Sequence, residues 1–238
     1  MSSWSSQIIA DSRCGGLSQA LSIFGEMMKS EEKLDEFVLG RLLRASSGLS
    51  DLCIGEQLHA KAIRLGHALE CGVRCSLIAM YSTCGFLELA HWVFDEVPSV
   101  HETDVPTWNA IISVYYDMCF LLFSDMLNIG HLAPSDATYA SIIRACGSAN
   151  DVEIGKMVHA MIVKDATLDK TKLLNSLITM YSKCGDLNNA NKVFQTMDRM
   201  NIVSWNAMIA GLGQNEEFRC ALEVFRALTR LFIFEIGV

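Results

Sequence analysis

The sequence predicts an all-α fold, a right-handed α-solenoid of stacked helix–turn–helix repeats. Three observations support this prediction: one phrase occurs twice one hundred residues apart, each copy carries apolar residues at helical spacing, and a glycine separates two such patterns. Similarity at a fixed period is typical of repeat proteins, in which each unit buries its apolar face only against its neighbours.

The long period is clear in two ten-residue phrases. "YSTCGFLELA", which starts at Tyr81, returns as "YSKCGDLNNA", which starts at Tyr181. Matches at the same offset begin with Arg44 and Arg144, and include the pair His59 and His159. A shorter period of roughly 31–35 residues lies inside the long one, which is a length typical of two-helix repeats.

Each short period contains two helical patterns. Leu187, Ala190 and Phe194 fall on one face of a predicted helix, and Trp205 falls on one face with Ile209 in the next. A glycine such as Gly185 between two patterns allows the left-handed backbone that a tight turn needs. We therefore expect helix, glycine turn, helix in every unit.

The period divides the chain into seven expected units, 1–35, 36–70, 71–104, 105–135, 136–170, 171–201 and an incomplete one at 202–230, followed by an unmatched tail at 231–238. The unit at 105–135 lacks about five residues where the turn should stand. We expect that this unit cannot close as a normal helix pair. The unit at 71–104 has extra residues around "SVHETD".

Composition argues against several classes of function. The formal net charge is −8, with 19 Lys and Arg against 27 Asp and Glu, which counts against a nucleic-acid partner. The nine cysteines are an odd number without zinc-finger spacing, which favours reduced thiols over disulfides or a metal site. We find no apolar run of about 18 residues and no catalytic or cofactor-binding motif. The sequence predicts neither a membrane span nor an enzyme, and no metal or cofactor.

Two longer segments resemble one known family. "LLNSLITMYSKCGDLNNANKVFQTM" and "WNAMIAGLGQNEEFRCALEVF" are close to the consensus of the pentatricopeptide repeat, and "IIRACGSANDVEIGKMVHAMIVK" is similar to its long variant. The alternation resembles the plant subclass that mixes standard, long and short repeats. This resemblance implies binding of single-stranded RNA, one base per repeat, in a mitochondrion or chloroplast. It further implies C-to-U editing with RNA-editing partner proteins, and neither DNA nor membrane as a partner.

The resemblance also implies which residues read bases. It places a reading pair at the fifth and last residues of each standard or short repeat: Ser5 with Asp35, Cys75 with Asp104, Asn109 with Ser135, Asn175 with Asn201, and Asn206 without a partner. By the tendencies of the family, the first pair favours a purine, and the third and fourth favour cytosine over uracil. The long repeats are expected to act as spacers, and Lys183 can contact phosphate.

Structural alternatives stand beside these assignments. The recurrence of Cys84 and Cys184 before the turn glycine indicates packing, and His59 and His159 recur as expected interface residues. Trp108 and Trp205 have core spacing. An asparagine at the start of a helix can cap it, which is the competing interpretation of Asn175 and Asn206.

Two other functional hypotheses stay open. A protein-binding helical-repeat scaffold suits the negative charge better than RNA binding does. A truncated copy without a function of its own would explain the shortened unit and the unmatched tail.

Overall fold

The computed structural model describes residues 34–96, 103–115, 118–165 and 167–236, together with residue 22. Across these residues the regular structure is helical throughout, and the all-α prediction is confirmed. None of the helices in this part of the chain combines the length and the hydropathy of a membrane span. Of the expected first unit, 1–35, only residues 22, 34 and 35 are described, so Ser5 lies outside the described residues.

The chain divides into two compact units, residues 1–133 and 134–238, which we call the N-terminal and C-terminal units. The described helices of the N-terminal unit are α3 (Glu36–Leu49), α4 (Leu52–Leu65), α5 (Cys71–Thr83), α6 (Leu87–Asp95), α7 (Val105–Val114) and α8 (Cys119–Asn128). Those of the C-terminal unit are α9 (Asp136–Ala149), α10 (Val152–Lys164), α11 (Lys170–Lys183), α12 (Leu187–Gln195), α13 (Ile202–Gln214) and α14 (Phe218–Ile236).

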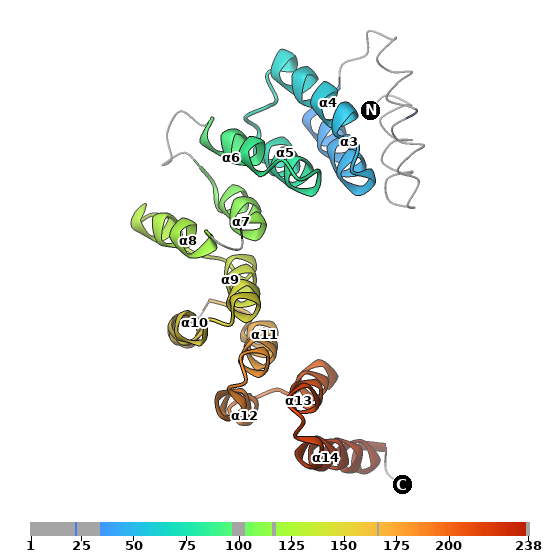
Figure 1. Ribbon diagram of the computed structural model, residues 1–238, viewed down its shortest axis with the longest axis vertical. Coiled ribbons are helices and arrows are strands. Elements are labelled where there is room, and N and C mark those ends of the chain that lie inside the picture. The colour runs from blue at the N-terminus through green and yellow to red at the C-terminus, as the bar shows by residue number, and fades with distance from the viewer. Residues whose placement is uncertain (1–21, 23–33, 97–102, 116–117, 166, 237–238) are drawn as a thin grey trace. The chain divides into compact units, whose positions relative to one another are not determined.

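Helices pack in hairpins, and the hairpins pack in series within each unit (Figure 1). The odd-numbered helix of each pair contacts the odd-numbered helix of the next pair, as α3 does with α5 and α11 does with α13. The even-numbered helices contact their own partner and the following odd-numbered helix, as α12 does with α13. The odd-numbered helices thus form one layer in each unit, and the even-numbered helices form another.

Local sequence explains where the helices turn. Gly85 and Gly185 have φ angles of 86° and 75°, in the left-handed region that glycine adopts without strain, and each follows the end of an odd-numbered helix. Asp51, Asp151 and Asp186 cap the even-numbered helices that follow, because each carboxylate accepts a hydrogen bond from a backbone N–H three residues later. The short turns hold the two helices of a hairpin side by side.

Aromatic pairs connect one hairpin to the next. Phe94 of α6 meets Trp108 of α7 edge to face, with ring centroids 4.8 Å apart, and Phe194 of α12 meets Trp205 of α13 at 5.0 Å. Trp108 is only 2% exposed. Such edge-to-face pairs add to the burial of the rings, so the core interpretation of these tryptophans is supported over a role as stacking platforms.

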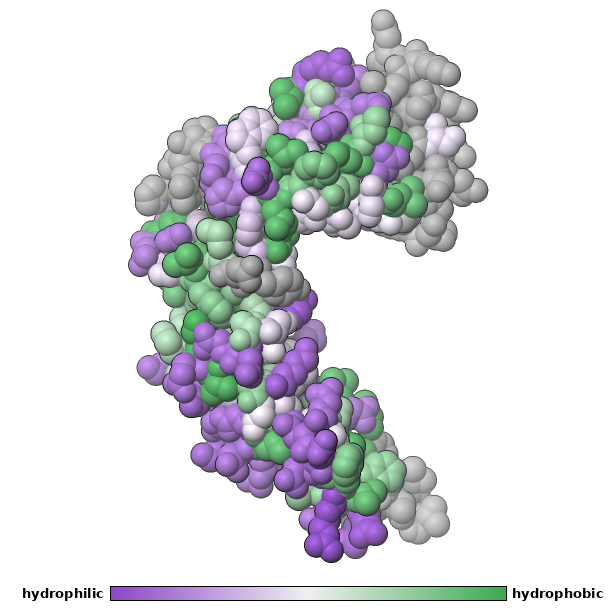
Figure 2. All heavy atoms as spheres, viewed as in Figure 1, coloured by the Kyte–Doolittle hydropathy of each residue, from purple (hydrophilic) through white to green (hydrophobic). Residues whose placement is uncertain are grey.

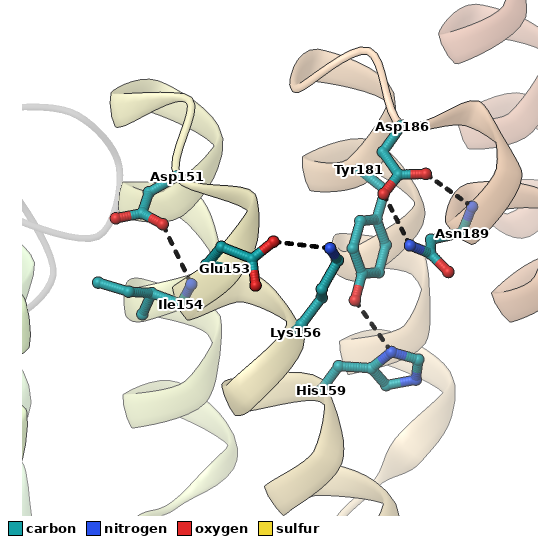
Figure 3. Close-up of polar contacts among 8 residues, drawn as sticks. All are labelled: Asp151, Glu153, Ile154, Lys156, His159, Tyr181, Asp186 and Asn189. Carbon is teal, nitrogen blue, oxygen red and sulfur yellow. Dashed lines mark hydrogen bonds and ion pairs between the residues drawn. The ribbon is translucent and has the colours of Figure 1, made fainter.

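A contact between a histidine and a tyrosine occurs twice, one hundred residues apart. His59 Nδ1 lies 2.8 Å from the Tyr81 hydroxyl, which connects α4 to α5. His159 Nδ1 lies 3.2 Å from the Tyr181 hydroxyl, which connects α10 to α11 (Figure 3). Burial lowers the pKa of both histidines, and at His59 the nearby Glu96 partly opposes this effect. These contacts agree with the expected interface role.

The expectation that residues 105–135 cannot close as a helix pair is wrong. Helices α7 and α8 both form and pack against each other, with Ile111 and Phe123 buried. The missing residues shorten the end of the first helix: α7 has 10 residues, whereas α5 has 13 and α11 has 14. The shortened α7 still buries Trp108, Ile111 and Ile112, so the hairpin keeps an apolar core without the last turn that α5 and α11 have.

Candidate nucleic-acid interface

The expected reading residues at the fifth position lie on the odd-numbered helices. Cys75, Asn109 and Asn206 are each the fifth residue of their helix, and Asn175 is the sixth residue of α11. None of the four is at an N-cap, so the interpretation of Asn175 and Asn206 as capping residues is wrong. Asn206 is exposed, whereas Cys75 and Asn109 are half-buried.

Asn175 has an unusual environment. It is only 8% exposed, and its Oδ1 is buried without a hydrogen-bond donor among the described residues. An unpaired buried oxygen costs about 1–3 kcal/mol. The repeat does not need an amide there, because Cys75 occupies the equivalent place one hundred residues earlier. An oxygen that packing neither pairs nor requires is a candidate for contact with a ligand.

The expected reading residues at the last position all cap helices. Asp35 accepts a hydrogen bond from the Val38 N–H at 2.8 Å at the start of α3, and Asp104 accepts one from the Thr107 N–H at 2.9 Å at the start of α7. The other two, Ser135 and Asn201, make reciprocal capping boxes at the starts of α9 and α13. These positions therefore have a structural role, which the sequence interpretation did not include. The signal was present, since Asp, Ser and Asn directly before an apolar helical run are typical N-caps.

The capping of α13 fixes how Asn201 presents its amide. Its Oδ1 accepts hydrogen bonds from the Ser204 N–H at 3.0 Å and the Ser204 hydroxyl at 3.1 Å. With the oxygen engaged, the amide nitrogen is the group that stays available as a donor. Asn201 is exposed, and α13 packs against α11, which carries Asn175.

Asp104 and Cys75 belong to one cluster between α5 and α7. The Arg74 Nη2 lies 3.7 Å from Asp104 Oδ2, and the Arg74 Nε donates to the Thr107 hydroxyl at 3.2 Å. Burial works to raise the pKa of Asp104, but hydrogen bonds from Cys71 and Thr107 and the charge of Arg74 outweigh it and lower the pKa. Asp104 thus neutralises a buried arginine, which weakens its candidacy as a base reader.

The thiol of Cys75 is not activated for chemistry. Its Sγ lies 3.7 Å from the Thr107 hydroxyl, and burial raises its pKa. A neutral thiol is only a weak hydrogen-bond donor. Across the described residues, no group of three or more His, Cys, Asp or Glu side chains is placed to hold a metal ion.

Cations border the odd-numbered layer of the C-terminal unit. A groove of about 310 Å³ lies between α9 and α11, and Arg144 and Lys183 line it together with the hydroxyls of Ser176 and Thr179. Both cations are exposed. Sequence reasoning identified Lys183 and missed Arg144, although the recurrence of Arg44 and Arg144 was visible in the sequence.

Charge differs between the two units. Residues 134–238 contain 11 Lys and Arg against 11 Asp and Glu, so the whole formal charge of −8 falls on residues 1–133. The groove between α3 and α5, of about 250 Å³, accordingly mixes Arg41 and Arg44 with Glu36 and Glu70. Figure 2 shows hydrophilic side chains over α11 and α12 in the C-terminal unit. The C-terminal unit is therefore better suited to a polyanion than the chain average indicates.

A family model and several known sequences are similar to this chain. The family model described as PPR repeat matches residues 173–202 and 203–231. Three pentatricopeptide repeat-containing proteins of Arabidopsis thaliana are similar over most of the chain. One named as mitochondrial is 32% identical over 95% of this chain and 27% of its own length. One named as chloroplastic is 31% identical over 99% and 28%. A second mitochondrial one is 33% identical over 88% and 45%. The chain thus spans less than half the length of these relatives.

Solved structures show the same fold. Pentatricopeptide repeat protein PPR10 from maize aligns with a TM-score of 0.60 at 18% identity, over 95% of this chain and 38% of that one. A crystal structure of PPR10 in complex with an 18-nucleotide psaJ RNA element aligns with a TM-score of 0.58, also at 18% identity, over 95% and 39%. With the hairpin architecture, the repeated turn phrase and the matched relatives in agreement, we conclude that the chain belongs to the pentatricopeptide repeat family.

Proposed function

We propose that the chain binds single-stranded RNA through the odd-numbered helices, chiefly those of the C-terminal unit, and recognises bases rather than catalysing a reaction. The observation that carries the proposal is Asn175, whose buried amide oxygen is unpaired within the described residues and unnecessary for packing. Unstacked bases expose Watson–Crick edges that amide groups can pair with, which is how helical-repeat proteins read RNA.

The proposed reading set is the one given by the resemblance, ordered by the geometry. Asn175 with Asn201 is the best supported pair, and Asn206 follows as an exposed amide on the next odd-numbered helix. Asn109 with Ser135, and Asp35 with Ser5, stay as proposals of lower rank. Cys75 with Asp104 ranks last, because both side chains already take part in the cluster around Arg74.

Arg144 and Lys183 supply phosphate contacts in this proposal. Both line the groove between α9 and α11, and α11 is the helix that carries Asn175. A cation that neutralises a phosphate releases counterions, so each contact contributes about 0.7 to the slope of log affinity against log salt for a single strand. A contact with phosphate contributes equally for every base, whereas a hydrogen bond from Asn175 to a base depends on which base is present.

The experiment is fluorescence anisotropy of labelled single-stranded RNA with the purified chain, across a salt series. Arg144→Ala and Lys183→Ala should each weaken binding similarly for every sequence and lower the slope by about 0.7. Lys156→Ala is the matched control, because Lys156 is ion-paired with Glu153 on α10 at 2.7 Å and should leave both quantities unchanged (Figure 3). The proposal fails if no binding occurs at low salt or if all three variants behave alike.

We propose further that the RNA is an organelle transcript and that the process served is C-to-U editing, with catalysis supplied by partner proteins. The support is the alternation of repeat types and the relatives named as mitochondrial or chloroplastic. The test is RNA sequencing of organelle transcripts from a plant lacking the gene. Loss of conversion at one or a few cytosines is expected, whereas unchanged editing with altered transcript ends would point to another step of RNA processing.

A protein-binding scaffold is the second candidate, and one observation favours it. Helix α14 exposes Phe218, Leu222 and Phe225, each at least half accessible, along one face. A contiguous apolar face of this kind is typical of protein contact sites. Affinity purification with and without nuclease separates the two functions: a scaffold keeps its partners after nuclease treatment, whereas an RNA binder loses those held through RNA.

A further inference from the structure

A second concave site lies in the C-terminal unit, formed by α10, α11 and α12. Its volume is about 520 Å³, and none of the proposed reading residues lines it. The floor is apolar, since the largely buried side chains of Ile162, Val193 and Met197, which are 0%, 1% and 6% exposed, line its base. Clefts of this size with an apolar floor are typical of small-molecule sites.

The rim of this cavity is cationic. Lys170, Lys192 and Arg199 line it, with Asp198 as the one carboxylate in the lining. Lys192 and Arg199 are exposed, and neither has a carboxylate partner within 4.0 Å among the described residues. The Lys170 ammonium donates to the Val163 carbonyl at 3.0 Å, which holds it at the edge of the cavity.

The repeat framework does not require these cations. At the hundred-residue offset in the N-terminal unit, Trp92 stands where Lys192 stands, and Glu70 stands where Lys170 stands. The Trp92 ring lies 6.2 Å from that of His59, so an aromatic side chain contacts the histidine there. The same hairpin packing is thus achieved with a tryptophan and an acid at these positions. Of these two equivalent places, only the one in the C-terminal unit carries lysines at both positions.

We propose that the cavity between α10, α11 and α12 binds an organic anion with an apolar body, either a phosphate monoester or a carboxylate. The apolar body lies on the floor of Ile162, Val193 and Met197, and the anionic group meets the cations of the rim. An apolar floor supplies affinity through burial, and charge-assisted hydrogen bonds from Lys and Arg select the anion. None of the residues that we propose to contact RNA lines this cavity.

The test is titration calorimetry of the full chain with four probes: hexyl phosphate, hexanoate, inorganic phosphate and hexanol. At least one of the first two should bind saturably, because it alone offers both parts. Inorganic phosphate and hexanol should bind at least about tenfold more weakly, the factor that corresponds to losing one charge-assisted hydrogen bond or a comparable apolar contact. A response to only hexyl phosphate or only hexanoate identifies the headgroup.

Variants locate the binding in the cavity. Lys192→Ala should weaken binding roughly tenfold, and Lys192→Trp, which copies the N-terminal unit, should abolish it. Lys156→Ala, on α10 but outside the cavity lining, removes the same charge and should change nothing. Circular dichroism at the helical band verifies that each variant is folded.

Three results would overturn the inference. The first is that neither hexyl phosphate nor hexanoate binds better than inorganic phosphate and hexanol. The second is that Lys192→Trp binds as the unaltered chain does, or that Lys156→Ala loses as much affinity as Lys192→Ala. The third is that Lys192→Trp weakens RNA binding as strongly as Arg144→Ala does, since the cavity would then be part of the RNA surface.

Discussion

Asn201 is proposed to serve two functions at once, and two substitutions can separate them. Its Oδ1 caps α13 through the Ser204 N–H at 3.0 Å, while the Ser204 hydroxyl lies 3.2 Å from the Asn201 N–H and accepts its hydrogen bond. Its amide nitrogen is the proposed donor to a base. Asn201→Ala removes both functions, whereas Asn201→Asp keeps the capping oxygen and removes only the donor.

The expected stabilities follow from the capping geometry. Loss of an N-cap side chain costs about 1 kcal/mol, which corresponds to a fall of roughly 2–4 °C in Tm for a chain of this size. Asn201→Asp should melt at or above the unaltered chain, because a carboxylate at a helix N-terminus adds about 0.3–1 kcal/mol at low ionic strength. Thermal unfolding followed by circular dichroism measures both variants.

The RNA measurement should rank the variants differently. Both substitutions remove the amide donor, so both should lose the preference for cytosine at one position, although only Asn201→Ala is destabilised. If Asn201→Asp melts as low as Asn201→Ala, the side-chain oxygen at position 201 does not stabilise α13 as a cap. If Asn201→Asp keeps the original base preference, the donor has no part in recognition.

Three further outcomes are expected. Asn175→Leu should abolish base preference at one position yet leave Tm unchanged or higher, because it replaces a buried unpaired amide by an apolar side chain of similar size; a marked fall in Tm would contradict this. Gly211→Ala should lower the free energy of unfolding by about 1–3 kcal/mol, because its Cβ would lie 2.6 Å from the Cβ of Ser182 on α11. Gly213→Ala, whose Cβ would meet nothing within 4 Å apart from its own helix backbone and chain neighbours, should raise it by about 0.5–1 kcal/mol. Equal effects in chemical denaturation would contradict the close approach. Burial lowers the pKa of His59 and His159, so below about pH 6.5 the unfolded chain binds more protons than the folded chain, and stability should fall as the pH is lowered from there. Replacing both histidines by Gln should reduce the change in Tm between pH 7.5 and 5.5. The same dependence of Tm on pH in this variant would contradict the prediction.

Much of the fold could be predicted because the residues that form turns and core contacts occur more than once at equivalent positions. Gly85 and Gly185 mark two turns, and Phe94 with Trp108 and Phe194 with Trp205 fill equivalent places in the core. A pattern that occurs twice at a fixed offset indicates that equivalent residues pack in the same way in both places. The helix pairs and the burial of the aromatic residues follow from that repetition.

The closure of the shortened unit and the caps at the last positions were not predicted, for different physical reasons. A gap in an alignment does not say which helix loses residues, and the structure shows that α7 is shorter than α5 and α11. The capping role of Asn201 was missed because the resemblance assigned the position to base reading, and one side chain can do both. The basic cavity depends on Lys192 replacing Trp92, and its consequence is visible only in three dimensions.

Asn175 is proposed to read a base in single-stranded RNA bound to the odd-numbered helices. Selection from a random single-stranded RNA library, with the unaltered chain and with Asn175→Ala in parallel, tests it most directly. The unaltered chain should enrich a pyrimidine at one position, and Asn175→Ala should lose the preference there while keeping every other one. Identical enriched sequences for the two proteins, or no enrichment at low salt, would contradict it.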